Sequence, residues 1–275
     1  MKDAALKTGN VDLKTVEGFG KEWGRFTQRE MSDAERAEVF SKYFSLIDWS
    51  RKPSRALDMG CGSGRWDLLV APLVAQLVAA DASPEALLVA RRNVELPNVS
   101  FVEATAETLP FPDGYFDFIF SLGVLHHVPD TQGAIDALTA KLSSGGALLL
   151  YLYYAFDTRP GWFKMLWKIS DWIRRLVCRL PFPLRYGFSQ VVAVFVYWPL
   201  ARTAKYLPVP ESWPLKFYAN RSFYFMRTDA LDRFGTRLEK RFTQKEITAM
   251  LERAGLKNVR FSEGDPYWVC VATKP

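Results

Sequence analysis

A glycine-rich stretch at residues 60–64 (GCGSG) limits what this chain can fold into more than any other part of the sequence. It follows Arg55–Met59, which is typical of a short buried strand, and it precedes Arg65–Val74, whose apolar residues predict a helix. Glycines at such a turn let the backbone approach a ligand beyond the carboxyl end of a parallel strand. The dinucleotide pattern GxGxxG would need glycine in place of Arg65, so the turn indicates a ligand without a pyrophosphate.

Strand and helix patterns alternate along most of the remaining chain. Further strands are predicted at 76–80, 99–103, 116–121, 147–152, 259–262 and 268–273. Helices are predicted after the cap Ser83, over 131–142, and after the capping boxes that begin at Ser32 and Thr243. This alternation predicts an α/β fold with a doubly wound sheet. Asp58 ends the first strand, and Asp81 ends the second at the usual distance of a ribose-binding acid from the glycines.

Three motifs occur in a fixed order: ALDMGCGSGR at 56–65, ETLPFPDGYFD at 107–117 and SLGVLHH at 121–127. Together they resemble class I S-adenosylmethionine-dependent methyltransferases, in particular the ubiquinone and menaquinone biosynthesis group. The resemblance covers roughly residues 55–152 and 242–275. It implies a Rossmann-like, doubly wound sheet of seven strands with an antiparallel last strand, in a core formed by residues 51–153 and 242–275.

The resemblance also implies a cofactor and the residues that hold it. The cofactor is S-adenosylmethionine, and the product is S-adenosylhomocysteine. The implied contacts are Asp58, Gly60 and Gly62 for the methionine part, Asp81 and Ala82 for the ribose and adenine, and Ser121 and Leu122 for the pocket floor; Gly64 is a further expected cofactor-binding residue. The position before Ala106 is often aspartate in relatives but is Thr105 here, so the adenine amine would bond to the threonine hydroxyl or to the backbone of Ala106.

The two histidines of the chain, His126 and His127, follow the fourth predicted strand at the same edge of the sheet. Methyl transfer is an in-line displacement that mainly needs alignment, and a hydroxyl acceptor gains from a general base. We expect one histidine, preferably His127, to be that base or to orient the acceptor; the alternative is that both are packing residues of the fold. We therefore expect O-methylation of a small, hydrophobic acceptor. A non-catalytic S-adenosylmethionine-binding protein and a membrane-associated lipid or quinone methyltransferase remain alternatives.

Two further parts of the chain bear on the acceptor. Residues 1–50 are expected to form helices, with Phe19, Trp23 and Phe26 at helical spacing. These N-terminal helices form either a lid over the site or a layer packed on the sheet edge. Residues 154–241 form an insertion too long for a loop, expected to be mostly helical. Residues 151–241 hold about 16 basic and 6 acidic residues and 22 of the 40 aromatic residues. Three roles are open for the insertion: it caps the strand ends, it docks on anionic lipid, or it binds nucleic acid. The third role is the one we do not expect, because no basic tail or nucleic-acid-binding module is visible.

The remaining composition excludes several classes of protein. Cys61, Cys178 and Cys270 are far apart in sequence, which argues against a metal site and a disulfide framework. The longest apolar stretch, Val191–Leu200, has about half the length of a membrane-spanning helix, and residues 1–10 lack the apolar run of a secretory signal. We therefore expect a cytoplasmic protein, with the inner face of a membrane as the alternative location.

Overall fold

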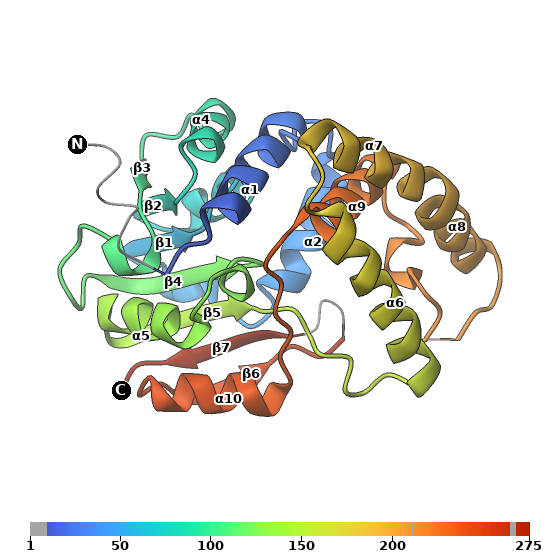
Figure 1. Cartoon of the computed structure of the whole chain (residues 1–275). Coiled ribbons are helices and arrows are strands. Elements are labelled where there is room, and N and C mark those ends of the chain that lie inside the picture. The colour runs from blue at the N-terminus through green and yellow to red at the C-terminus, as the bar shows by residue number, and fades with distance from the viewer. Residues whose placement is uncertain (1–9, 211, 265–267) are drawn as a thin grey trace. The chain divides into compact units, whose positions relative to one another are not determined.

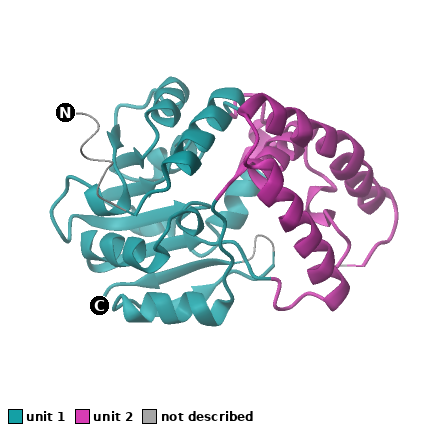
Figure 2. Cartoon of the chain, viewed as in Figure 1, with its two compact units in different colours: residues 1–27, 37–155, 238–275 teal, residues 28–36, 156–237 magenta. Residues whose placement is uncertain are grey.

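The computed structural model describes residues 10–210, 212–264 and 268–275, so the predicted features at residues 1–9 lie outside the described part. The chain forms two compact units (Figure 2). Unit 1 comprises the described residues of 1–27, 37–155 and 238–275, and unit 2 comprises those of 28–36 and 156–237. Each unit has its own buried apolar residues.

A seven-stranded sheet forms the centre of unit 1 (Figure 1). Its strands are β1 (Arg55–Met59), β2 (Gln76–Asp81), β3 (Val99–Glu103), β4 (Phe116–Leu122), β5 (Leu142–Tyr151), β6 (Lys257–Phe261) and β7 (Val269–Thr273). The order is β3-β2-β1-β4-β5-β7-β6; the first five strands run parallel, and β7 runs antiparallel to β5 and β6. The predicted Rossmann-like sheet with an antiparallel last strand is confirmed. Parallel strands covered on both faces must be apolar throughout, as the fully buried Leu148, Leu149 and Leu150 of β5 are.

Helices flank the sheet. They are α1 (Leu13–Arg25), α2 (Asp33–Tyr43), α3 (Asp67–Val70), α4 (Pro84–Asn93), α5 (Thr131–Lys141) and α10 (Gln244–Arg253). The predicted helix over 65–74 is wrong in length, because α3 has a single turn and gives way to a 3₁₀ turn at Ala71–Leu73. Pro72 explains the difference: it has no N–H for an α-helical bond, and its ring clashes with the carbonyl four residues earlier.

The helix caps follow the sequence with one exception. The Ser83 hydroxyl accepts from the Ala86 N–H at 3.2 Å, and the capping box that begins at Thr243 is complete. At α2 the Ser32 hydroxyl accepts from the Glu35 N–H at 3.2 Å, but the Glu35 carboxylate accepts from the backbone N–H of Ser222 at 2.9 Å. A long-range contact within unit 2 thus uses the acid that the local pattern assigned to the helix start.

Unit 2 is helical, as predicted for the insertion. It contains α6 (Gly161–Val177), α7 (Phe182–Val192), a π-helical segment (Ala193–Tyr197), α8 (Trp198–Tyr206) and α9 (Phe223–Gly235). Helix α9 packs against α6 and α7. The core of unit 2 consists of apolar residues from these helices and the π-helical segment: Val177, Ala193, Tyr197, Ala201, Met226, Ala230 and Phe234. Among the described residues, no helix combines the length and the apolar composition needed to cross a membrane.

Candidate active site

The turn after β1 places three glycines in backbone conformations that other residues rarely adopt. The φ angles of Gly60, Gly62 and Gly64 are +86°, +56° and +76°. A Cβ atom on Gly60 would lie 2.4 Å from Cγ2 of Val124, and one on Gly62 would lie 2.9 Å from the indole of Trp23. Glycine is therefore required here for its conformation and for the close approach of neighbouring side chains.

Asp81, at the end of β2, joins the second strand to the glycine turn. Its Oδ2 accepts from the Gly62 N–H at 2.9 Å, and its Oδ1 accepts from the Ser83 N–H at 2.8 Å. Burial raises the pKa of Asp81, and the backbone N–H donors partly oppose that shift because they stabilise the carboxylate. Each carboxylate oxygen has two lone pairs, so Asp81 can hold the turn and still accept from a ligand.

Asp58 and Asp67 form a pair of buried carboxyl groups beneath the turn. Both side chains lie inside the protein, with 1% and 0% of their surfaces exposed. Among the described residues, Oδ2 of Asp58 and both carboxyl oxygens of Asp67 have no hydrogen-bond partner. Burial raises the pKa of both groups, and the neighbouring Asp67 raises that of Asp58 further. Burial also raises the pKa of the nearby Cys61 thiol, which suits a small packing side chain.

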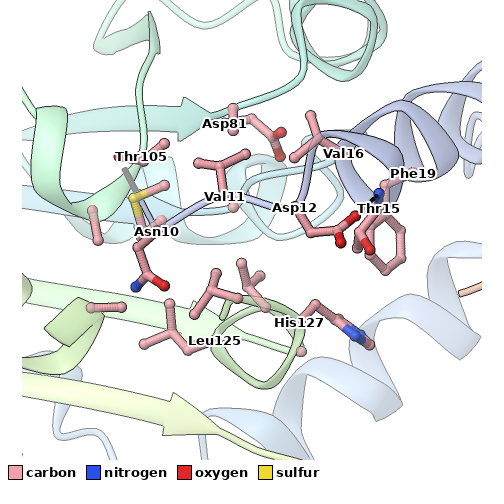
Figure 3. A pocket seen from close by; sticks show the side chains of 18 of the residues that line it. Asn10, Val11, Asp12, Thr15, Val16, Phe19, Asp81, Thr105, Leu125 and His127 are labelled. Atoms are coloured by element: carbon pink, nitrogen blue, oxygen red, sulfur yellow. Dashed lines mark hydrogen bonds between the residues drawn. The ribbon is translucent and has the colours of Figure 1, made fainter. Parts of the chain in front are cut away.

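A pocket opens beside the turn, with about 840 Å³ of space including the part open to solvent. Figure 3 shows Asp81 and Thr105 along one side, Leu125 and His127 along the other, and Asn10–Asp12 crossing between them. All residues that line it belong to unit 1. Its charged lining residues are Asp12, Asp81 and Glu107, and most of the others are apolar.

The structure brings some of the predicted site residues to this pocket and leaves others behind its wall. Those that line it are Gly60, Asp81, Ala82, Thr105, Ala106, Leu122 and His127. Those that do not are Asp58, Gly62, Gly64, Ser121 and His126. Ser121 is fully buried and donates to the carbonyl of Met59 at 2.8 Å, so its side chain ties β4 to β1.

Thr105 lies at the pocket and also caps a 3₁₀ turn over Ala106–Thr108. Its N–H donates to the Thr108 hydroxyl at 2.9 Å, and the two hydroxyl oxygens lie 3.2 Å apart. The Thr105 hydroxyl is thus already hydrogen bonded within the protein, which leaves the adenine contact as a prediction.

The two histidines occupy different environments. Nδ1 of His127 lies 2.7 Å from the carbonyl oxygen of Leu238. A carbonyl only accepts, so Nδ1 carries the hydrogen, and in the neutral ring the lone pair belongs to Nε2. His126 is fully buried and stacks on Tyr153 with ring centroids 3.7 Å apart. Burial holds the pKa of His126 well below its usual value, with smaller contributions from His127 and Arg241, so its ring is neutral.

Several lining residues escaped the sequence analysis. Asn10, Val11, Asp12 and Thr15 lie before or at the start of α1, and Glu107 follows β3. One local signal was present, because the Asp12 carboxylate accepts from the Thr15 N–H at 2.8 Å as an N-terminal helix cap. That signal predicts where a helix begins, but it does not indicate that the segment crosses a pocket.

Part of the chain is similar in sequence to known methyltransferases. A family model described as "Methyltransferase domain" matches residues 57–150. The uncharacterized methyltransferase YcgJ of Bacillus subtilis is 36% identical over 108 residues, which cover 38% of this chain and 43% of YcgJ. The ubiquinone/menaquinone biosynthesis C-methyltransferase UbiE of Shewanella oneidensis is 29% identical over 153 residues, which cover 48% of this chain and 61% of UbiE. The chain thus matches less than two thirds of the length of either relative.

A solved structure extends the similarity of fold over nearly the whole chain. It is that of a SAM-dependent methyltransferase from Thermotoga maritima, with a TM-score of 0.51 and 15% sequence identity. The match covers 96% of this chain and 98% of that protein. At this level of identity the match concerns the fold alone.

Proposed function

We propose that the protein is a class I S-adenosylmethionine-dependent methyltransferase that methylates a small, apolar acceptor. The match of residues 57–150 to a methyltransferase domain and the similarity to UbiE support this proposal. One observation carries the proposal: the carboxylate of Asp81 accepts from the Gly62 N–H at 2.9 Å and lines the same pocket as Gly60. A glycine turn and a ribose-binding acid at the carboxyl ends of parallel strands make a nucleoside site.

In this proposal the cofactor lies along the side of the pocket formed by the turn. The remaining lone pairs of Asp81 would accept from the two ribose hydroxyls, and Ala82, Thr105 and Ala106 would hold the adenine. Asp58 lies behind the pocket wall, so it acts on the amino group of the methionine part through the turn or through water. The acidic lining also suits the positive sulfonium of S-adenosylmethionine.

The acceptor then lies on the other side of the pocket, near Leu125, Val128 and Phe19. These side chains favour an apolar molecule. Asp12 and Glu107 disfavour an anionic acceptor, since like charges repel at short range in a site with little water. A neutral molecule with a hydroxyl group fits this lining.

His127 acts as the general base. Because the Leu238 carbonyl fixes the hydrogen on Nδ1, Nε2 can take the proton from the acceptor hydroxyl. When bound, S-adenosylmethionine would supply an electrophilic methyl group for in-line transfer, and His127 would take the proton that the acceptor oxygen gives up. Phe19 packs against the imidazole, with ring centroids 4.9 Å apart, and holds its orientation.

The test measures release of S-adenosylhomocysteine with a panel of hydroxylated, carbon-acid and amine acceptors. The carbon acids are included because UbiE is named a C-methyltransferase. A His127→Asn variant keeps an N–H that can reach the Leu238 carbonyl but has no base, so we expect about 100-fold slower turnover with unchanged cofactor affinity. Weaker cofactor affinity with intact turnover would contradict the role given to His127.

Cofactor binding separates the proposal from its alternative. Titration calorimetry should show binding of both S-adenosylmethionine and S-adenosylhomocysteine. Binding without turnover on any acceptor of the panel would favour the non-catalytic binding protein. Failure of both ligands to bind would contradict the proposed function itself.

A further inference from the structure

Helix α6 of unit 2 exposes an apolar face along its whole length. The exposed side chains recur at every third or fourth position, which places them on one side of a helix. They are Trp162, Met165, Leu166, Ile169, Trp172 and Leu176. Met165 and Trp172 have 62% and 64% of their surfaces exposed, more than a side chain packed in the core of unit 2 could have.

The opposite side of α6 accounts for its attachment to unit 2. Asp171, Arg174 and Val177 are buried there. The Arg174 guanidinium donates to Asp171 at 2.8 Å and to the carbonyl of Thr236, at the end of α9, at 2.9 Å. The buried side of α6 therefore holds the helix in place, and the exposed apolar face adds nothing to that attachment.

A basic stripe borders the apolar face. Lys164, Lys168 and Arg175 follow each other at spacings of four and seven residues, which keeps them on one side of the helix, and Arg179 follows two residues after its end. Lys168, Arg175 and Arg179 are exposed. Asp171 is the single acidic residue of α6, and its Oδ2 accepts from Nε of Arg175 at 2.8 Å, so Lys168 and Arg179 are the exposed members of the stripe that this acid leaves unneutralised. An exposed apolar face beside a row of basic side chains is the pattern of a helix that lies in the interface of an anionic membrane.

We propose that α6 docks unit 2 on the surface of an anionic lipid bilayer. The apolar face enters the boundary between head groups and acyl chains, and the basic stripe pairs with lipid phosphates. The helix is too short and too charged to cross the membrane, so it lies parallel to the surface. The charge of the segment supports lipid over an apolar protein partner, since residues 151–241 hold about 16 basic and 6 acidic residues.

The proposal is independent of the proposed methyl transfer, because it concerns residues that do not line the pocket. The test is co-sedimentation of the full chain with vesicles of phosphatidylcholine alone and of phosphatidylcholine with phosphatidylglycerol. We expect binding to the anionic vesicles only, and weaker binding at high salt because ions screen the basic stripe. No sedimentation with anionic vesicles at low salt would overturn the proposal.

Two double variants separate the apolar and the electrostatic contributions. Met165→Ser with Trp172→Ser removes part of the apolar face, and Lys168→Glu with Arg179→Glu reverses two charges of the stripe. Each should weaken vesicle binding at least about tenfold, since each changes two residues, one basic residue near an anionic surface contributes roughly fivefold, and one buried apolar side chain contributes at least as much. These side chains are exposed, so circular dichroism and unfolding midpoints should match those of the unchanged protein.

Matched controls lie in unit 1. Leu88→Ser removes an exposed leucine of α4, and Lys245→Glu with Lys257→Glu reverses two exposed charges. Binding should survive in both controls. Equal losses in the controls and in the α6 variants would reduce the effect to general charge or hydrophobicity and overturn the proposal.

Light scattering and an RNA-binding assay test whether another partner occupies the apolar face of α6. A dimer that becomes monomeric on Met165→Ser with Trp172→Ser would assign the face to a second copy of this chain and overturn lipid docking. Tight, salt-dependent binding of RNA that the Lys168→Glu and Arg179→Glu variant abolishes, without vesicle binding, would overturn it in favour of nucleic acid.

Discussion

Replacing Asp81 by asparagine tests whether the acid after β2 holds both the glycine turn and the cofactor. The carboxylate accepts from the Gly62 N–H through Oδ2 and from the Ser83 N–H through Oδ1. An asparagine side chain has one oxygen and one NH₂ group in the same place. Whichever way the amide turns, its NH₂ faces a backbone N–H, so one of the two hydrogen bonds is lost.

The expected magnitudes follow from these contacts. A hydrogen bond to a charged group contributes about 1.5–3 kcal/mol. Burial raises the pKa of Asp81, so the neutral amide avoids part of the cost of burying a charge. We therefore expect a loss of about 1–2 kcal/mol in the free energy of unfolding. Cofactor binding loses a further charged bond to a ribose hydroxyl, which corresponds to roughly 10- to 100-fold weaker binding.

Asp117→Asn is the matched control. Asp117 accepts from the Ser54 N–H at 2.7 Å and from the Arg55 N–H at 3.0 Å, so it uses two backbone donors as Asp81 does. It lies at the amino-terminal ends of β1 and β4, whereas the pocket opens at their carboxyl-terminal ends. The control should lose similar stability and keep its affinity for S-adenosylhomocysteine.

Titration calorimetry with S-adenosylhomocysteine and denaturant unfolding of all three proteins give the comparison. Binding by Asp81→Asn within about twofold of the unchanged protein, a difference of roughly 0.4 kcal/mol, would refute the role of Asp81 in holding the ribose. Equal losses of affinity in both variants would refute the claim that the effect belongs to the pocket.

Two further predictions concern the residues around the turn. Gly60→Ala should lower the free energy of unfolding by about 2–4 kcal/mol, because the new side chain combines a strained positive φ with a clash against Val124. Gly145→Ala is the control: its φ is similar at +76°, but no atom lies within 4 Å of the new Cβ, so it should show the cost of the strain alone. Asp67→Asn should flatten the pH dependence of stability. Burial raises the pKa of Asp67 above its usual 3.8, so at about pH 5 the folded protein keeps a proton that the unfolded chain releases. The unchanged protein therefore loses up to about 1.4 kcal/mol of stability per pH unit as the pH rises from about 4 towards neutral. Unfolding at about pH 5 and about pH 8 tests this, and parallel curves for Asp67→Asn and the unchanged protein would contradict it.

The sequence predicts the parts of the site that depend on neighbours along the chain. The turn at 60–64 and Asp81 lie at the ends of strands, and their chemistry is visible in the residues themselves. The two halves of the capping box at Thr243 are likewise three residues apart. Local patterns of this kind predict the doubly wound sheet and the residues that we expect on the cofactor side of the pocket.

Other parts depend on contacts between distant residues. The Asn10 side chain hydrogen bonds to Glu107 at 2.8 Å and to the backbone of Asp130, and no local pattern brings these residues together. The same holds for the Leu238 carbonyl, which fixes the hydrogen of His127 from 111 positions away. The acceptor side of the pocket is therefore the part that the sequence leaves open.

The position of β7 inside the sheet has a consequence for how the chain folds. Strand β5 pairs with β7, which lies more than 100 residues later, beyond the whole of 156–237. Until β7 arrives, the side of β5 that it covers is an open edge next to Leu148–Leu150, an apolar run with unpaired backbone groups. Such an edge is a template for pairing with other chains. The long interval between the two strands thus leaves β5 open to aggregation while the protein is being made or refolded.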